Sequence, residues 1–387
     1  MKKLNVAIIG TGFMGKAHSN GWRQAPKFFQ LGIEPVLKVA CDTEVDCTSN
    51  FAKNWGWEDI ETDWRKVIER KDVDIIDICT PTWLHQDMAI AAAKHGKHIF
   101  CEKPITLNYD GAKEMFEAAE KAGVVHYLNH NYRRAPAVSF AKKLIEEGKI
   151  GTIYHWRGTY LQDWITDPKF PLTWHLQKKF AGAGPHYDLN SHSVDLGRYL
   201  VGDIQAVTAL MKTFIPERPL PGKGAGTFKA GTGATDVGKV TVDDAAFMLV
   251  EFENGALGSF EASRFANGRK NYNYFEIYGS KGSLVFNLER MNELQYLDLS
   301  DTADEQGFRT ILVTNSTHPY VAAWWPPGHI IGYEHEFVHA MVDFLGAIEK
   351  GTKIAPNFYD GMKAMQVLEA GIKSAETGKK VTVADIK

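Results

Sequence analysis

Two parts of the sequence carry residues whose types and spacing suit proton transfer to or from a hydroxyl group. In the first, the short stretch 98–101 predicts a strand, and Lys103 lies two residues beyond it, after Glu102. A lysine amine at a strand end can hydrogen-bond a substrate hydroxyl and act in acid–base catalysis. In the second, residues 182–202, Asp188 lies one helical turn before His192. A carboxylate in that position can orient an imidazole and raise its basicity, so the pair predicts a general base.

The same residues allow other interpretations. Lys103 could be a solvated lysine with no chemical role, and the 182–202 side chains could form a buried network that only stabilises the fold. His186, Asp188 and His192 are also metal-ligand types, but neither a third histidine nor an H-E-x-x-H spacing accompanies them. The sequence therefore favours acid–base chemistry and predicts no metal site.

A glycine turn near the N-terminus predicts a dinucleotide site. In LNVAIIGTGFMGKAH (4–18), an apolar run is followed by Gly10, Gly12 and Gly15 at the G-x-G-x-x-G spacing. The glycines allow a tight turn, close approach of a pyrophosphate and close packing of the next helix, whose N-terminus favours phosphate. Asp42 ends the second predicted strand, where a carboxylate would accept hydrogen bonds from the ribose hydroxyls and repel a 2′-phosphate. The pattern favours NAD over NADP, although Asp42 could instead cap the following helix.

Strands alternating with helices position these residues. Apolar strands at 4–9, 36–42, 73–80 and 98–101, with helices between them, predict an α/β domain over 1–128 with a doubly wound parallel sheet. Ligands of such sheets bind beyond the carboxyl ends of the strands. The residues expected to hold the cofactor at that edge are Gly10, Thr11, Gly12, Phe13, Met14, Gly15, Asp42, Thr80, Pro81, His85, Glu102 and Lys103.

The remaining chain, 129–387, predicts a second, α+β domain. Half-buried strands are expected at 153–160, 206–214, 245–264, 274–288 and 294–299, with an Asn254-Gly255 hairpin turn. Helices are expected at 137–147, 334–349 and 356–377. These strands predict a large, open, mostly antiparallel sheet, and a partner subunit is the expected cover for its free face. The Gly- and Pro-rich segment 216–239 predicts a long loop, either a lid or an oligomer arm.

Composition limits the classes of partner. A net charge of −3 without a Lys/Arg run argues against nucleic-acid binding. No stretch approaches the roughly 18 apolar residues of a membrane-spanning helix. The four cysteines, Cys41, Cys47, Cys79 and Cys101, lack C-x-x-C spacing. Reduced, inert cysteines of a cytoplasmic protein are the expected interpretation.

Three motifs in this order resemble those of the glucose–fructose oxidoreductase/inositol dehydrogenase/MocA family: the glycine turn, Glu102-Lys103-Pro104, and the D-x-x-x-H-x-x-D pattern of 188–195. The resemblance covers nearly the whole chain. It implies a Rossmann domain followed by the open-sheet domain, and a homo-oligomer formed through that sheet. Its catalytic set corresponds to Lys103, Asp188 and His192. Substrate contacts are implied for Lys103, Tyr132, Gln162, Trp164, His175, Asp188 and His192.

The resemblance implies an NAD-dependent dehydrogenase that oxidises a secondary hydroxyl of a cyclic polyol or pyranose, such as inositol, levoglucosan or the 3-hydroxyl of a glucoside. His192 would take the hydroxyl proton, Lys103 would stabilise the alkoxide, and Asp188 would orient His192. Two rival functions remain at this stage. One is an NAD-dependent glycosidase that acts by transient oxidation and elimination, and the other is a non-catalytic NAD-binding regulator.

Overall fold

The computed structural model describes residues 2–222 and 236–387, and its contacts divide the chain into two compact units. The first unit comprises residues 1–135 and 314–363, and the second comprises 136–313 and 364–387. Residues 314–363 thus belong to the first compact unit, whereas the sequence suggested a single domain boundary near residue 128. The assignment of functions to 1–128 and 129–387 remains a prediction.

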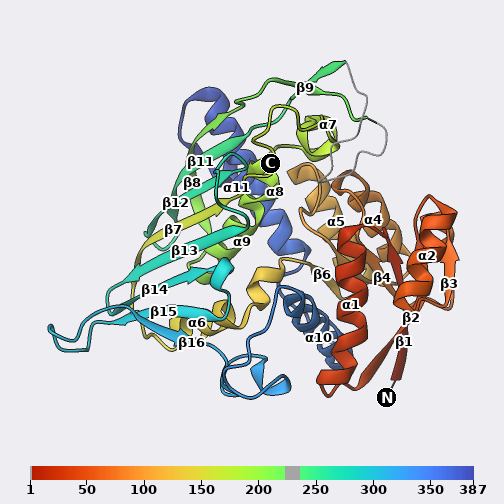
Figure 1. Cartoon of the computed structure of the whole chain (residues 1–387), viewed down its shortest axis with the longest axis horizontal. Helices are drawn as coiled ribbons and strands as arrows, with labels where there is room; N and C mark the ends of the chain where they lie inside the picture. The colour runs from red at the N-terminus through yellow and green to blue at the C-terminus, as the bar shows by residue number, and fades with distance from the viewer. Residues whose placement is uncertain (1, 223–235) are drawn as a thin grey trace. The chain divides into compact units, whose positions relative to one another are not determined.

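The first unit is built on a six-stranded parallel sheet in the order β3-β2-β1-β4-β5-β6 (Figure 1). Its central strand β1 pairs with β2 on one side and β4 on the other, and residues 6–9 are fully or almost fully buried. Burial on both faces explains why residues 6–9 form a continuous apolar run. The strands are β1 (Lys2–Ile9), β2 (Ile33–Cys41), β3 (Asp59–Glu61), β4 (Ile75–Ile78), β5 (His98–Cys101) and β6 (His126–Leu128).

Six helices accompany this sheet: α1 (Phe13–Phe28), α2 (Val45–Trp55), α3 (Trp64–Glu69), α4 (His85–Lys94), α5 (Tyr109–Ala122) and α10 (Glu334–Lys350). Helix α10 packs on α1 although more than 300 residues separate them in sequence. Their approach is close at Gly21, where an added Cβ would lie 2.6 Å from the Met341 sulfur. This contact is one reason why 334–350 belongs to the first unit, and the sequence pattern of the helix does not reveal it.

The second unit contains a nine-stranded sheet in the order β16-β15-β14-β13-β7-β12-β11-β8-β17. All neighbouring pairs are antiparallel except β12 and β7. Its strands are β7 (Ile153–Leu161), β8 (Ile204–Lys212), β11 (Ala245–Phe252), β12 (Leu257–Ser263), β13 (Tyr272–Gly279), β14 (Gly282–Asn287), β15 (Glu293–Asp298), β16 (Arg309–Leu312) and β17 (Val381–Thr382). The expected Asn254-Gly255 hairpin is confirmed between β11 and β12.

Helices cover one face of this sheet. They are α6 (Pro136–Glu146), α8 (Pro185–Asp188), α9 (Asn190–Leu200) and α11 (Phe358–Thr377), of which α11 begins in the first unit. The short helix α7 (Lys178–Ala181) packs against the 3₁₀ turn at 174–176. Trp156, Phe260 and Phe275 form a buried aromatic core under α9. Gly197 lets α9 approach this core, since a Cβ there would lie 2.8 Å from the Phe260 ring.

The other face of the sheet keeps large apolar side chains in solvent. Leu210, Phe247, Leu249 and Leu257 are between 48% and 73% exposed, and they lie on the adjacent strands β8, β11 and β12. We call these four residues the outer apolar patch.

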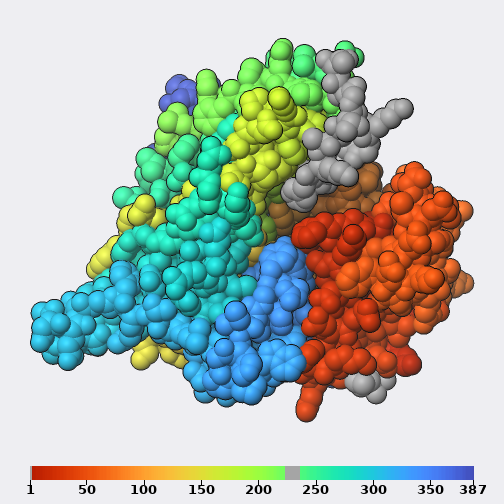
Figure 2. Space-filling model, viewed as in Figure 1, coloured from red at the N-terminus to blue at the C-terminus, as the bar shows by residue number. Residues whose placement is uncertain are grey.

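At the other end of the sheet, the segment joining β15 to β16 protrudes from the sheet (Figures 1 and 2). The predicted fold class, a parallel sheet plus a mostly antiparallel open sheet, is confirmed.

Two local expectations need correction or restriction. The predicted helix through Asp188 and His192 is two short helices, because α8 ends at Asp188 and α9 begins at Asn190. The His192 N–H bonds to the Leu189 carbonyl three residues back, which marks the irregularity. The ends of segment 216–239 pair as strands β9 (Glu217–Pro219) and β10 (Val237–Lys239). The question of a lid or an arm concerns 223–235, which lie outside the described residues. In the described part of the chain, no helix is long and apolar enough to cross a membrane.

Candidate active site

The glycine turn between β1 and α1 has the shape of a phosphate cradle. Gly10 has φ +104°, and a Cβ there would lie 2.6 Å from the Cys79 carbonyl oxygen. A Cβ on Gly15 would lie 2.3 Å from the Gly10 carbonyl oxygen, whereas one on Gly12 would meet nothing within 4 Å. Among the described residues, no side chain caps the N-terminus of α1 and no acidic residue lies in its first turn. The turn therefore fits a dinucleotide pyrophosphate, with open space at Gly12 and unopposed helix N–H groups.

Asp42 lies directly beside this turn. Its Oδ2 accepts hydrogen bonds from the Thr11 N–H at 2.8 Å and the Thr11 hydroxyl at 2.6 Å, and its Oδ1 accepts from the Thr43 N–H at 2.8 Å. Burial opposes ionisation, but the bonds from Thr11 and Thr43 outweigh it and lower the Asp42 pKa. A carboxylate has about four acceptor positions, and the fourth on Asp42 is filled only weakly, by the Thr43 hydroxyl at 3.5 Å, which a ribose hydroxyl could replace.

The side chain of His85 bridges the segments that follow β4 and β5. Its Nε2 lies 2.8 Å from the Thr80 carbonyl oxygen and its Nδ1 lies 3.0 Å from that of Pro104. The ring is buried, and this burial lowers its pKa. His85 thus ties the Thr80-Pro81 segment to the segment that carries Lys103. Lys103 itself is half-buried, and the Lys103–Pro104 peptide is cis.

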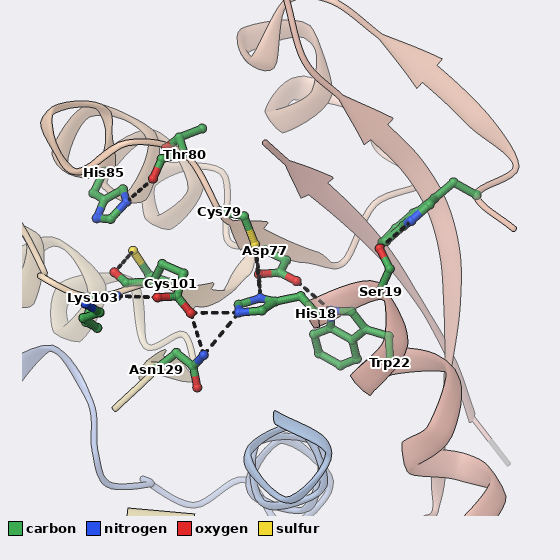
Figure 3. Close-up of polar contacts among 12 residues, drawn as sticks. His18, Ser19, Trp22, Asp77, Cys79, Thr80, His85, Cys101, Lys103 and Asn129 are labelled. Carbon is green, nitrogen blue, oxygen red and sulfur yellow. Dashed lines mark hydrogen bonds and ion pairs between the residues drawn. The ribbon is translucent and has the colours of Figure 1, made fainter. Parts of the chain in front are cut away.

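Behind Lys103 lies a buried network centred on His18 of α1 (Figure 3). The His18 Nδ1 is 2.8 Å from Asp77 Oδ1, and its Nε2 is 2.8 Å from Glu102 Oε1. The Asn129 amide donates to Glu102 Oε1 at 2.6 Å, and the Trp22 indole donates to Asp77 Oδ2 at 2.7 Å. Glu102 Oε2 accepts the Lys103 backbone N–H at 3.1 Å. Burial disfavours the charged ring, but Asp77 and Cys79 raise the His18 pKa well above its ordinary value.

His18, Asp77 and Cys79 are also metal-ligand types in one cluster. Their separations of 2.8 Å for His18–Asp77 and 3.1 Å for His18–Cys79 are hydrogen-bond distances. Burial is the main cause that raises the pKa of the Cys79 thiol, so this side chain stays protonated. We interpret the cluster as a hydrogen-bonded network.

The second unit assembles a separate polar group around Arg264, which directly follows β12. Its Nη2 lies 2.6 Å from Asp188 Oδ2, and its guanidinium carbon lies 5.1 Å from the centre of the Trp164 ring. The Trp164 indole donates to the Gln162 side-chain oxygen at 2.8 Å, and the Gln162 amide donates to Asn271 at 3.0 Å. The structure thus brings together three predicted substrate residues, Gln162, Trp164 and Asp188, within one unit.

The other predicted residues of this unit lie near the same group. His175 meets the Trp164 ring edge-on at 5.8 Å, and His192 lies 5.9 Å from the Tyr160 ring. His192 is almost fully buried on α9. His186 is fully buried, and its Nε2 lies 2.7 Å from the Leu368 carbonyl oxygen. In the first unit, Tyr132 is buried in a 3₁₀ turn (Asn131–Arg134), while Phe13 is exposed and Met14 half-buried beside the glycine turn.

Sequence reasoning missed His18, Asp77, Asn129 and Arg264. A signal existed for Asp77, because a charged residue inside an otherwise apolar parallel strand requires a buried partner. His18 lies one turn beyond Gly15 on α1, where it faces the sheet, but its partners at 77 and 102 are not apparent from α1 alone. Arg264 had no local signal, since its partner lies 76 residues away.

Comparisons with known proteins support the two-part organisation. Residues 4–130 match a family described as an oxidoreductase family with an NAD-binding Rossmann fold, and residues 138–285 match the GFO/IDH/MocA C-terminal domain. The chain is 46% identical to a levoglucosan dehydrogenase of Pseudarthrobacter phenanthrenivorans over 100% of both proteins. It is 25% identical to a myo-inositol 2-dehydrogenase of Thermotoga maritima over 99% of both.

Among solved structures, a levoglucosan dehydrogenase in complex with NADH and levoglucosan superposes with a TM-score of 0.93. It is 44% identical and covers 99% of this chain and 100% of its own. A family domain is thus matched in each half, and a relative well above 30% identity spans the full length. The chain belongs to the GFO/IDH/MocA family of oxidoreductases, whose N-terminal part is an NAD-binding Rossmann domain.

Proposed function

We propose that this protein oxidises a secondary hydroxyl of levoglucosan, or of a closely related pyranose, with NAD as the acceptor. The similarity to levoglucosan dehydrogenase supports the substrate class, because the two sequences are 46% identical over the whole of both chains. The Gln162–Trp164–Arg264–Asp188 group also supports it. An indole face suits the apolar C–H face of a sugar ring, and an amide and a carboxylate offer hydroxyl partners.

The nucleotide-binding roles follow from the first unit. The turn at Gly10, Gly12 and Gly15 would hold the pyrophosphate, and Asp42 would accept the ribose hydroxyls. Bound NAD supplies the hydride acceptor. His85 keeps the Thr80 and Pro104 carbonyls in place, and Glu102 receives the backbone N–H of Lys103.

The proton-transfer roles are divided between the units. We assign to His192 the removal of the hydroxyl proton, and to Lys103 the stabilisation of the oxygen as negative charge develops on it. Asp188 is held by Arg264 at 2.6 Å, so its carboxylate is available at a fixed place to orient His192 or to accept a sugar hydroxyl. Tyr132, Gln162, Trp164 and His175 remain the proposed substrate contacts.

The full-length similarity to levoglucosan dehydrogenase is the observation that carries this proposal. The test is NAD reduction by the purified protein, followed at the nicotinamide absorbance band, with levoglucosan, myo-inositol, scyllo-inositol and glucose compared. We expect the highest kcat/KM with levoglucosan. Release of a reducing sugar from a glucoside without net NADH would replace the proposal by a glycosidase. NADH binding without turnover of any sugar would replace it by a regulator.

Two further properties belong to the proposal. The outer apolar patch supports a homo-oligomer formed through the open sheet, because four adjacent, half-exposed to mostly exposed apolar side chains are unusual on a free surface. The four cysteines are unpaired and three of them are buried, which supports a reducing compartment such as the cytoplasm.

A further inference from the structure

The buried network behind Lys103 connects two elements that the proposed reaction uses. Helix α1 begins at the phosphate cradle, and strand β5 ends at Glu102-Lys103. Between them lies one imidazole, that of His18, with a carboxylate oxygen 2.8 Å from each of its nitrogens. His18 and Asp77 are fully buried and Glu102 is 4% exposed.

A carboxylate oxygen faces each ring nitrogen of His18, and Asp77 and Cys79 raise the His18 pKa, so the ring is an imidazolium that donates to both carboxylates. Every oxygen of the two carboxylates accepts at least one hydrogen bond. Trp22 donates to the second oxygen of Asp77, and Asn129 donates to the same Glu102 oxygen that faces His18. The rings of Phe100 and Phe337 lie 5.2 and 5.5 Å from the His18 ring and separate it from water. A buried network in which every carboxylate oxygen and both ring nitrogens are hydrogen-bonded is held rigidly.

The hydrogen-bonded network of His18 extends to the backbone of Lys103. Glu102 Oε1 is fixed by His18 and Asn129, and its Oε2 receives the Lys103 backbone N–H (Figure 3). Moving or rotating the Glu102 carboxylate would release that N–H and shift the lysine backbone. Effective catalysis requires the reacting group to be held closely, and a misplacement of about 1 Å can cost on the order of 100-fold in rate.

We infer that His18 is a positioning residue: clamped between Asp77 and Glu102, it fixes the backbone of Lys103 relative to the helix that begins at the phosphate cradle. It touches neither the cradle nor the lysine side chain in this network. Its effect on the reaction passes through Glu102. The inference rests on the proposed function, in which Lys103 is a catalytic residue.

A double-mutant cycle tests this route. We expect His18→Gln and Glu102→Gln each to lower kcat at saturating NAD and sugar by about 10- to 100-fold. The double variant should fall no further than the worse single variant, because both changes break one connection. KM for the sugar should change little for His18→Gln. Additive losses, or a wild-type kcat in folded His18→Gln protein, would overturn the inference.

His339→Gln is the matched control for a purely structural loss. His339 is also fully buried in the first unit, with the Trp324 indole donating to its Nε2 at 2.7 Å and its Nδ1 lying 2.9 Å from the Arg134 carbonyl oxygen. We expect His339→Gln to lower the midpoint of thermal unfolding as His18→Gln does, but to keep the wild-type kcat. An equal kcat loss in both variants would mean that kcat follows stability alone, and would contradict the positioning role.

If His18→Gln does not yield folded protein, a comparison of the Asp77→Asn and Glu102→Gln variants tests the positioning role of His18. Both replace a buried carboxylate 2.8 Å from the same imidazole, but only Glu102 reaches Lys103. We expect a drop in kcat for both variants, smaller for Asp77→Asn because its effect on Lys103 passes through the imidazole, and a wild-type kcat in folded Asp77→Asn protein would overturn the inference. Wild-type protein that oxidises no sugar would instead overturn the proposed function, so the two failures are distinct.

Discussion

The Arg264 guanidinium holds the Asp188 carboxylate at 2.6 Å from a position that is itself 1% exposed. The pair lies beside Trp164, whose ring centre is 5.1 Å from the guanidinium carbon. Among the described residues, no hydrogen-bond partner reaches Arg264 Nε or Nη1. A buried cation with one carboxylate partner and two unused donors must gain its remaining bonds from water or from a bound ligand. Arg264 therefore fixes the position of a carboxylate that the sequence predicts to be catalytic.

Arg264→Ala should lower kcat/KM for the sugar by roughly 10- to 100-fold, since a hydrogen bond to a charged group contributes about 1.5–3 kcal/mol. Arg264→Lys should restore only part of the loss, because an ammonium lacks the planar fork of a guanidinium. The measurement is steady-state kinetics with the sugar varied at saturating NAD.

Arg198→Ala provides the control. Arg198 forms an ion pair of similar length with Asp203, at 2.7 Å, within the same unit but at the end of α9. It should leave kcat/KM unchanged. If Arg264→Ala behaves like this control in a folded protein, then Asp188 does not depend on Arg264 for its role.

Asp42→Asn should shift the cofactor preference towards NADP. The amide retains an acceptor oxygen for the Thr11 N–H and hydroxyl, which Asp42 Oδ2 accepts at 2.8 and 2.6 Å, but the negative charge that repels a 2′-phosphate is lost. We expect the ratio of kcat/KM for NADP to that for NAD to rise about tenfold, one factor of ten for each 1.4 kcal/mol. An unchanged ratio would show that Asp42 acts only through Thr11.

The sequence predicted best where the pattern is local. The apolar run before Gly10, the strand 98–101 and the Asn254-Gly255 turn each depend on a few neighbouring residues, and each is confirmed. The division of the chain into compact units was not accessible in this way. Helix α10 carries an ordinary amphipathic pattern, and its contacts in the fold, such as that of Met341 with Gly21, show which unit it joins.

The site residues remain predictions, and the sequence pointed to them for the same local reason. Motifs gave Lys103, Asp188 and His192, because the types and spacing of their neighbours are visible in the chain. The residues that hold them lie far away in sequence: His18 is 84 residues from Glu102, and Arg264 is 76 from Asp188. The type of one side chain does not indicate a partner so far away in the sequence. The supporting residues can therefore be identified only from the three-dimensional structure.

Glu336 on α10 should make the stability of the first unit depend on pH. The side chain is fully buried, and burial raises its pKa from 4.5 to about 8, against a bond from the Asn131 amide at 2.6 Å. The folded protein thus binds this proton more tightly than the unfolded chain does. The stability this proton contributes is complete below about pH 4.5 and is lost as pH rises through 8, by about 1.4 kcal/mol per pH unit.

Glu336→Gln removes this titration while keeping an acceptor for Asn131. Relative to wild type, its midpoint of thermal unfolding should rise progressively between pH 5 and pH 8. The measurement is a series of paired unfolding curves across that range, so that other titrating groups cancel in the difference. A difference that stays constant with pH would mean that Glu336 is ionised in the folded protein.

Leu249→Arg should convert the proposed homo-oligomer to a smaller species. Leu249 lies on β11 within the outer apolar patch and is 66% exposed in the single chain, so an arginine there costs the isolated fold little. In an interface, the same arginine would be a buried, unpaired charge facing its own copy across a two-fold contact. Molar mass from light scattering during size-exclusion chromatography is the measurement.

Val45→Arg is the control for this change. Val45 is 55% exposed at the start of α2, in the other unit. The Val45→Arg variant should leave the molar mass of the assembly unchanged. This control shows whether the effect of Leu249→Arg depends on where the charge is added. Because large apolar side chains on a sheet face gain most from being covered, an unchanged mass in Leu249→Arg would place the contact between subunits on a different surface. A monomeric wild-type protein would leave the outer apolar patch without the partner that we propose for it.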